Sequence, residues 1–191
     1  DSRNAFNEIC RHIILEELAA APALRHLVPL FHKLFTTVTP IVVCTEDGPV
    51  VHHELRGREG TQQGASASSP LFGVGMHRVL RIITDLINDT YDGEGPKPFL
   101  RAGADDLAVE GDEDSLPPLL AAIEGEMAKI GLETQPKKSA VVPGPAYDED
   151  DRQRIAAKLA PWATMGSHRA GDGTPQPEHG VGTVLYGCPV G

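Results

Sequence analysis

The stretch RAGADDLAVEG, residues 101–111, indicates how this chain folds. Two short apolar runs, FLRA at 99–102 and LAVE at 107–110, flank the segment GADD. Such runs, separated by a few small or acidic residues, are typical of two strands joined by a tight turn. The stretch therefore predicts a β-hairpin with the adjacent carboxylates Asp105 and Asp106 at its turn. An acidic pair at a bend is common, and by itself it indicates only a solvated turn.

Helices and further strands are expected on both sides of this hairpin. Apolar residues recur at helical spacing in the first part of the chain, and the turn signal EDGP, residues 46–49, separates the apolar runs PIVVCT and VVHHEL. The predicted elements are helices over 4–18, 24–35, 71–88, 115–131 and 148–160, a hairpin over 40–55, a strand near 140, and a late strand with a tight turn over 182–191. Alternating hairpins and helices indicate an α+β domain, an antiparallel sheet with helices packed on one face.

Length and net charge restrict the class of protein. The chain has 191 residues, enough for one domain with a sizeable core. Its net charge of −10 divides into −2 over residues 1–101 and −8 over residues 102–191. A free-standing nucleic-acid binder is expected to be basic, so a nucleic-acid role would need a localised site or basic segments outside this chain.

The expected setting of the chain is intracellular and reducing. Its three cysteines, Cys10, Cys44 and Cys188, form no C-x-x-C pair and are odd in number, which argues against a disulfide framework. No window approaches the roughly 18 apolar residues of a membrane helix, so no membrane partner is expected. The chain begins at Asp1 without a Met, as expected of a segment of a longer protein.

Five short segments give the hairpin a functional context. In chain order they are DSRNAFN at 1–7, EGTQQGASASSPLF at 59–72, GADD at 103–106, GLETQPKKS at 131–139 and YGCPVG at 186–191. This succession resembles motifs A to E of the reverse transcriptase palm, most closely the non-LTR retrotransposon type, and it covers nearly the whole chain. The resemblance implies a polymerase palm whose fingers and thumb, segments of the same polyprotein, are missing or incomplete here. It also implies an RNA-directed DNA polymerase acting in the nucleus on an RNA template, a DNA primer and a dNTP.

The motif positions predict a division of the chain. Residues 1–145 would form the palm core with motifs A to D. Residues 146–180 would form a variable helix and a mobile loop, and residues 181–191 the start of a primer-grip-like hairpin, motif E. Since half of the substrate cradle would be absent, we expect the isolated chain to be inactive.

The resemblance assigns the acidic residues to a metal site. Joining a nucleotide to a primer requires activation of a 3′-hydroxyl and stabilisation of charge on the α-phosphate and the pyrophosphate, which two Mg²⁺ ions about 4 Å apart can provide. Such hard ions prefer carboxylate oxygens, and Mn²⁺ is a possible substitute. Asp1 from motif A and Asp105 and Asp106 from motif C would be the ligands, with Asp1 and Asp105 ranked above Asp106.

The other motif residues would bind the nucleotide. Phe6 stands where an aromatic ring excludes a 2′-hydroxyl and so selects deoxynucleotides, and the small Ala5 beside it leaves room for the sugar. Gln63 and Gly64 resemble the Gln-Gly of motif B, which approaches the sugar and base. Lys138 resembles the motif D lysine that protonates or neutralises the leaving pyrophosphate. For each of these residues the structural alternative is a packed or solvated side chain without a catalytic role.

Two further interpretations remain open. Gly-Asp-Asp also occurs in RNA-dependent RNA polymerases, although Phe6 and the QQG segment argue against that class. The second alternative is a degenerate, non-catalytic palm that acts as a nucleic-acid-binding or structural module. Three departures from the family pattern favour this degenerate palm: Gly103 where an aromatic is usual, Gln135 where Asn is usual, and an extra residue between Gln63 and Pro70.

Overall fold

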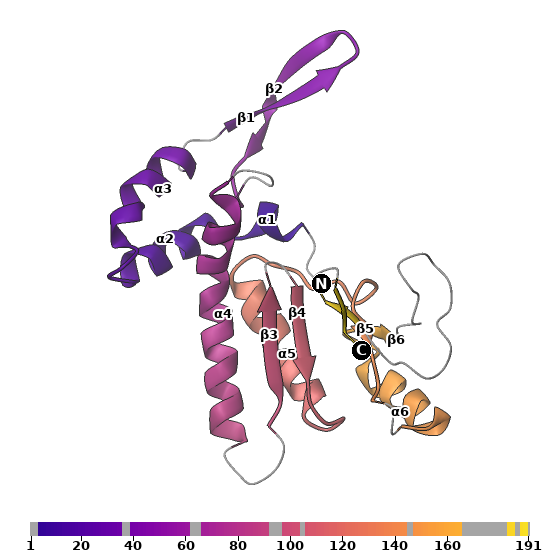
Figure 1. Cartoon of the computed structure of the whole chain (residues 1–191). Helices are drawn as coiled ribbons and strands as arrows, with labels where there is room; N and C mark the ends of the chain where they lie inside the picture. The colour runs from indigo at the N-terminus through magenta and orange to yellow at the C-terminus, as the bar shows by residue number, and fades with distance from the viewer. Residues whose placement is uncertain are drawn as a thin grey trace. The chain divides into compact units, whose positions relative to one another are not determined.

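The fold was obtained as a computed structural model (Figure 1). It describes residues 4–35, 39–61, 66–91, 97–103, 106–144, 147–165, 183–185 and 188–190, without side-chain detail for 39–44, 51–56, 183–185 and 188–190. The helices are α1 (Ala5–Glu8), α2 (Arg11–Ala20), the 3₁₀ turn η1 (Arg25–Leu27), α3 (Val28–Phe35), α4 (Ser68–Thr90), α5 (Leu116–Lys129) and α6 (Glu149–Leu159). The strands are β1 (Thr39–Thr45), β2 (Gly48–Gly57), β3 (Phe99–Gly103), β4 (Asp106–Glu110), β5 (Ala140–Val141), β6 (Thr164–Met165), β7 (Thr183–Leu185) and β8 (Cys188–Val190).

The α+β class predicted from the sequence is confirmed, but the strands are paired differently from a single antiparallel sheet. In the described part of the chain, β1–β2, β3–β4 and β7–β8 form separate antiparallel pairs. β5 and β6 pair in parallel, since α6 connects them as a crossover. Both main hairpins lie where the sequence predicts them.

The chain divides into two compact units. The first, here called the Phe6 unit, contains Arg3–Ile82 and Gly125–Glu133. The second, here called the Asp106 unit, contains Ile83–Glu124 and Thr134–Gly191. The division falls within α4 and α5, so each of these helices contributes side chains to both cores.

In the Phe6 unit, two helices replace the single helix predicted over residues 4–18. α1 ends at Glu8, Cys10 adopts an extended conformation, and α2 begins at Arg11. The N–H of Cys10 donates to the carbonyl of Ile130 at 2.9 Å, so a contact with the end of α5 replaces a helical hydrogen bond. Among the side chains that the structure describes in this unit, the buried apolar ones are Ala5, Ile9, Ile13, Ile14, Leu18, Phe31, Phe35, Leu71, Phe72, Met76, Val79, Met127, Ile130 and Leu132.

The end of α5 supports this break. Gly131 has φ +84°, and a Cβ there would lie 2.7 Å from the Cys10 sulfur and 2.9 Å from the Glu8 carbonyl oxygen. The N–H of Leu132 donates to Met127 at 3.0 Å, which closes the helix in a Schellman-type turn. The helix end predicted near Gly131 is therefore confirmed, and a glycine is needed there for both conformation and space.

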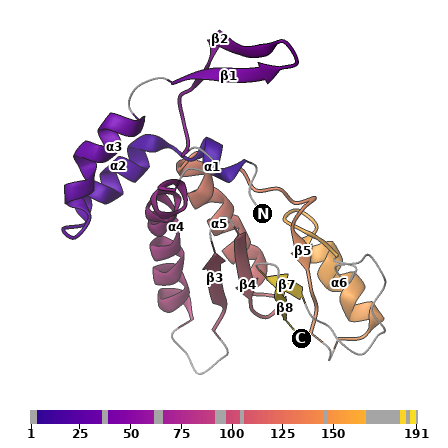
Figure 2. The same ribbon diagram turned by 45° about the horizontal axis from the view of Figure 1, so that its top comes forward.

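In the Asp106 unit, helices accompany the β3–β4 hairpin. α5 lies behind this hairpin in the view of Figure 1, and the turned view of Figure 2 agrees. Asp148 caps α6 by accepting from the N–H of Asp151 at 2.9 Å. The buried apolar side chains of this unit are Ile83, Ile87, Leu119, Ile123, Ile155 and Leu159. Among the helices of the described residues, none combines the length and apolarity needed to cross a bilayer.

Candidate functional site

The predicted nucleotide-binding aromatic, Phe6, lies on the short helix α1. Its side chain is half-buried, and its ring centroid is 4.6 Å from that of Phe72 on α4, with the planes tilted by 31°. The neighbouring Ala5 is buried, at 3% exposure. One part of the Phe6 ring is therefore packed in the core, while the rest stays accessible. The packed part stabilises the fold, and the accessible part is available to contact a ligand.

A second segment meets α1 beside Phe6. We call residues 57–61 the strap. The N–H of Gly60 donates to the carbonyl of Ile9 at 2.9 Å, and the N–H of Thr61 donates to the carbonyl of Phe6 at 2.6 Å. Thr61 is 1% exposed. The strap leads in sequence into Gln63 and Gly64, which lie outside the described residues.

A glycine makes this close approach possible. Gly60 has φ +75°, and a Cβ on it would lie 2.4 Å from the backbone of Asn7. Any other residue would meet both the conformational cost of this φ and a direct clash. The backbone of the strap is thus in contact with the backbone of α1.

The acidic residues of the expected metal site are only partly described. Asp106 is the first residue of β4, is exposed, and pairs across the hairpin with Gly103. Asp105 and Asp1 lie outside the described residues. Within the described part of the chain, no three His, Cys, Asp or Glu side chains are grouped as a metal site would require. Asp106 and Phe6 belong to different compact units.

Lys138 lies in the Asp106 unit, in the turn between α5 and β5. Its side chain is exposed. The turn is closed by the carbonyl of Gln135, which accepts from the N–H of Lys138 at 2.9 Å and from the N–H and hydroxyl of Ser139, both at 3.0 Å. The backbone of this lysine is therefore held, whereas its ammonium group is exposed to solvent.

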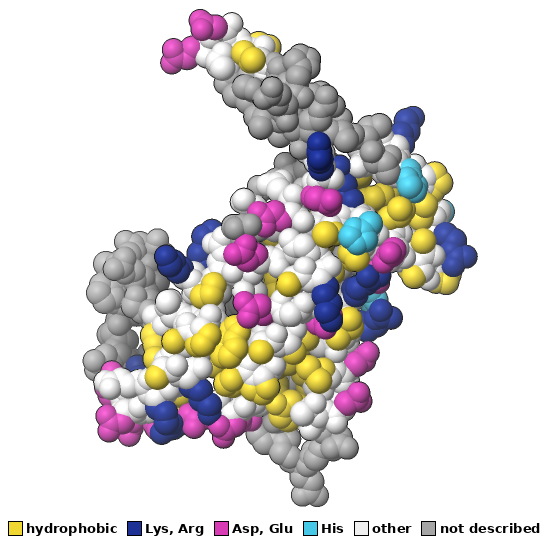
Figure 3. All heavy atoms as spheres, turned by 180° about the vertical axis from the view of Figure 1, so that it is seen from behind, with side chains coloured by type: hydrophobic (Ala, Val, Ile, Leu, Met, Phe, Trp, Pro, Cys, Tyr) yellow, Lys and Arg dark blue, Asp and Glu magenta, His cyan; other side chains and the backbone are white. Residues whose placement is uncertain are grey.

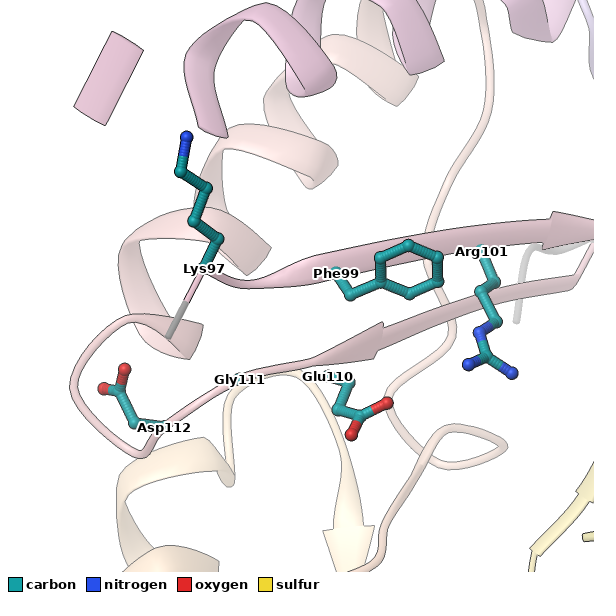
Figure 4. Close-up of a pocket in the computed structure, with 6 residues that line it drawn as sticks. All are labelled: Lys97, Phe99, Arg101, Glu110, Gly111 and Asp112. Atoms are coloured by element: carbon teal, nitrogen blue, oxygen red, sulfur yellow. The ribbon is translucent and has the colours of Figure 1, made fainter. Parts of the chain in front are cut away.

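An open hollow of about 420 Å³ on the β3–β4 hairpin was not anticipated from the sequence (Figure 4). Phe99 is 52% exposed, and the guanidinium of Arg101 lies 5.0 Å from its ring centroid. Phe99 and Arg101 share one face of β3, because they are two residues apart. The residues that line the hollow are Lys97, Phe99, Arg101, Glu110, Gly111 and Asp112. This combination offers an aromatic surface with charges of both signs, and the alternation of Phe99 and Arg101 is the signal that could have revealed it.

A charged cluster joins α2 to α4 in the Phe6 unit. Glu17 is buried, and its carboxylate accepts from Arg78 Nε at 2.8 Å and lies 3.4 Å from His77 Nδ1. Burial opposes ionisation of Glu17, but the hydrogen bonds from Arg78 and His77 and the charges of Arg78 and Arg81 outweigh it, so the pKa of Glu17 lies below its ordinary value. The arrangement fixes the two helices to each other.

Surface charge is mixed in sign. On the face seen in Figure 3, Lys and Arg side chains are interspersed with Asp and Glu among the described residues, and they do not form a broad basic band. This distribution agrees with the net charge of −10.

Comparison of the chain with protein-family models, with curated proteins and with solved structures found no match.

Proposed function

We propose that residues 1–191 form the palm of an RNA-directed DNA polymerase of the non-LTR retrotransposon type, which transfers a nucleotide from a dNTP to the 3′-hydroxyl of a DNA primer on an RNA template. The observation that carries the proposal is the contact between Thr61 and Phe6. It joins the segment that resembles motif A, residues 1–7, to the segment that resembles motif B, residues 59–72. A nucleotide pocket built from those two motifs requires them to be neighbours.

The β3–β4 hairpin is a second support. The sequence places Asp105 and Asp106 at its turn, and Asp106 is an exposed residue at the first position of β4, opposite Gly103. An exposed carboxylate at the end of a hairpin strand is accessible to a metal ion and to a primer end. The donor chemistry fits Mg²⁺, which prefers carboxylate oxygens and retains waters and substrate phosphates as its other ligands.

In this proposal each residue has a separate task. The carboxylates of Asp1, Asp105 and Asp106 would hold the metal ions, which when bound would supply activation of the primer hydroxyl and neutralisation of the triphosphate charge. The exposed part of the Phe6 ring packs under the sugar and excludes a 2′-hydroxyl, with Ala5 beside it. Gln63 and Gly64 approach the base and sugar, and Lys138 protonates the leaving pyrophosphate or neutralises its charge.

Template-directed extension tests the proposal. A chain that carries fingers and thumb segments before and after residues 1–191 is given a radiolabelled DNA primer annealed to an RNA template, with dNTPs and Mg²⁺. We expect extension that requires the metal, that Mn²⁺ restores after chelation, and that prefers dNTPs to NTPs. Extension with NTPs from an RNA primer would favour an RNA-dependent RNA polymerase. Nucleic-acid binding without extension would favour the degenerate palm.

A further inference from the structure

Besides its two backbone hydrogen bonds, the strap is bound by the guanidinium of Arg11, the first residue of α2. Arg11 Nε donates to the carbonyl of Gly60 at 2.8 Å, and Arg11 Nη1 donates to the carbonyl of Gly57 at 3.2 Å. Nη1 also donates to the carbonyl of Phe35, the last residue of α3, at 2.8 Å. A single side chain thus binds three backbone carbonyls, two in the strap and one at the end of α3, that are 24 to 49 positions from it in the sequence.

Two further contacts fix Arg11 itself. Its backbone N–H, which has no acceptor within α2 because it lies in the first turn, donates to the carboxylate of Glu59 at 3.0 Å. Its guanidinium carbon lies 5.6 Å from the centre of the Phe35 ring. Burial lowers the pKa of Arg11, while the charge of Glu59 opposes the shift. A charged group held among carbonyls at the edge of a core is costly to desolvate unless those carbonyls are its partners.

The strap in turn bears on Phe6. Gly60, which Arg11 binds through its carbonyl, is followed by Thr61, whose N–H donates to the carbonyl of Phe6. The Thr61 hydroxyl lies 3.4 Å from the same carbonyl oxygen. Arg11, Gly60, Thr61 and Phe6 therefore form a continuous chain of contacts inside the Phe6 unit.

We propose that Arg11 is a positioning residue for nucleotide selection: through the strap it fixes the backbone of Phe6, and so it sets how closely the Phe6 ring approaches the sugar. The proposal rests on the proposed polymerase function, since only there does Phe6 meet a nucleotide. Arg11 touches neither substrate nor metal in this scheme. Its effect is expected on discrimination between dNTP and NTP and on the KM for dNTP, more than on kcat.

The first measurement needs no activity. Amide hydrogen exchange of residues 1–191 is compared for the unmodified chain, Arg11→Gln and Arg11→Lys. Arg11→Gln removes the guanidinium that donates to the carbonyls of Gly57, Gly60 and Phe35. The amides of Gly60 and Thr61 are therefore expected to exchange at least about tenfold faster. Arg11→Lys keeps the charge and the apolar stem, but one ammonium cannot reproduce the planar fork, so an intermediate effect is expected. Arg25→Gln is the matched control, because Arg25 also donates from Nε to a backbone carbonyl, that of Ala19, at 3.0 Å.

The second measurement uses the extension assay with the longer chain. Arg11→Gln is expected to lower the ratio of kcat/KM for dNTP to that for NTP by about tenfold, with Arg11→Lys between it and the unmodified chain, and Arg25→Gln unchanged. Unchanged exchange of Gly60 and Thr61 in Arg11→Gln would overturn the proposal, because Arg11 would then not hold the strap. Faster exchange with an unchanged dNTP-to-NTP ratio would also overturn it, leaving Arg11 a purely structural residue. Absence of extension by the unmodified chain would instead reject the polymerase function, and the selection role with it, while the exchange data would still decide whether Arg11 holds the strap.

Discussion

Thr61 and Phe6 are 55 positions apart in the sequence, yet the N–H of Thr61 lies 2.6 Å from the carbonyl oxygen of Phe6. This hydrogen bond joins the end of the strap to the helix that carries the predicted sugar-selecting ring. Thr61 is buried, so the bond is shielded from water and its loss would leave a polar group unsatisfied. The contact makes the strap a part of the candidate nucleotide pocket.

Replacing Gly60 should damage this contact directly. Gly60→Ala places a methyl group 2.4 Å from the Asn7 backbone at a φ of +75°, so the strap must move away from α1. We expect the free energy of unfolding to fall by about 2 kcal/mol or more, measured by chemical denaturation. Gly73→Ala is the control: Gly73 lies within α4, where a Cβ meets nothing within 4 Å, and we expect a gain of about 0.5–1 kcal/mol. Equal effects of the two substitutions would contradict the packing described for the strap.

The proposed role of Phe6 in sugar selection predicts a change of specificity. Phe6→Val shortens the ring that would exclude the 2′-hydroxyl, so the extension assay should show incorporation of NTPs that the unmodified polymerase rejects. The tilted ring contact with Phe72 is lost as well, and we expect the free energy of unfolding to fall by about 1–3 kcal/mol. Phe31→Val serves as the control, because Phe31 is buried against Phe35 rather than beside Phe6. If Phe31→Val relaxed selection as much as Phe6→Val does, general loosening of the fold would explain both.

Much of the fold follows from local sequence patterns. The β3–β4 hairpin, the β1–β2 hairpin and the long helix α4 all lie where apolar spacing and turn residues predict them. The break at Cys10 could not be predicted in this way, because it depends on the carbonyl of Ile130, which is far away in the sequence. The same holds for β6, a two-residue strand whose pairing with β5 is decided by tertiary contacts rather than by propensity.

The candidate site was predicted less completely than the fold. Motif order singled out Phe6 and Asp106, and both are at least partly accessible in the structure. The polar, glycine-rich composition of residues 56–70 does not signal that Arg11 holds part of this segment against α1. Arg11 itself looks like an ordinary helical arginine in the sequence, since its partners are backbone carbonyls, which any residue carries.

The Glu17 cluster predicts a specific dependence of stability on pH. Because the pKa of Glu17 is lower in the folded chain than the ordinary value of about 4.3, its contribution is present above that value and is lost as the pH falls through the folded pKa. Glu17→Gln should therefore cost about 2 kcal/mol near pH 7, and the difference from the unmodified chain should narrow below about pH 5. Glu16→Gln is the control, since Glu16 pairs with the same Arg78 but is 58% exposed, and we expect at most about 1 kcal/mol. If the difference in unfolding free energy between Glu17→Gln and the unmodified chain increased as the pH falls, the lowered pKa of Glu17 would be contradicted.

The start of α5 depends on Asp112. Its carboxylate accepts from the N–H of Ser115 at 2.8 Å and of Asp114 at 2.9 Å, and these bonds, that of Ser115 foremost, lower the pKa of Asp112. The hydroxyl of Ser115, the residue before α5, donates back to the carbonyl of Asp112 at 3.0 Å. Asp112→Ala should cost about 1 kcal/mol in unfolding free energy, whereas Asp112→Asn, which keeps an acceptor oxygen, should cost less. Equal losses in denaturation experiments would show that the negative charge rather than the hydrogen bonds holds the turn.

The central claim, that this chain is the palm of an RNA-directed DNA polymerase, is tested most directly at Asp105. Primer extension on an RNA template is measured with the longer chain described above, for the unmodified protein, for Asp105→Asn, and for Glu110→Gln as an acidic control on β4 of the same hairpin. We predict robust extension by the unmodified protein, a loss of at least about 1,000-fold in Asp105→Asn because a metal ligand is removed, and near-normal extension in Glu110→Gln. Extension that survives Asp105→Asn, or a complete absence of extension in the unmodified protein, would contradict the account.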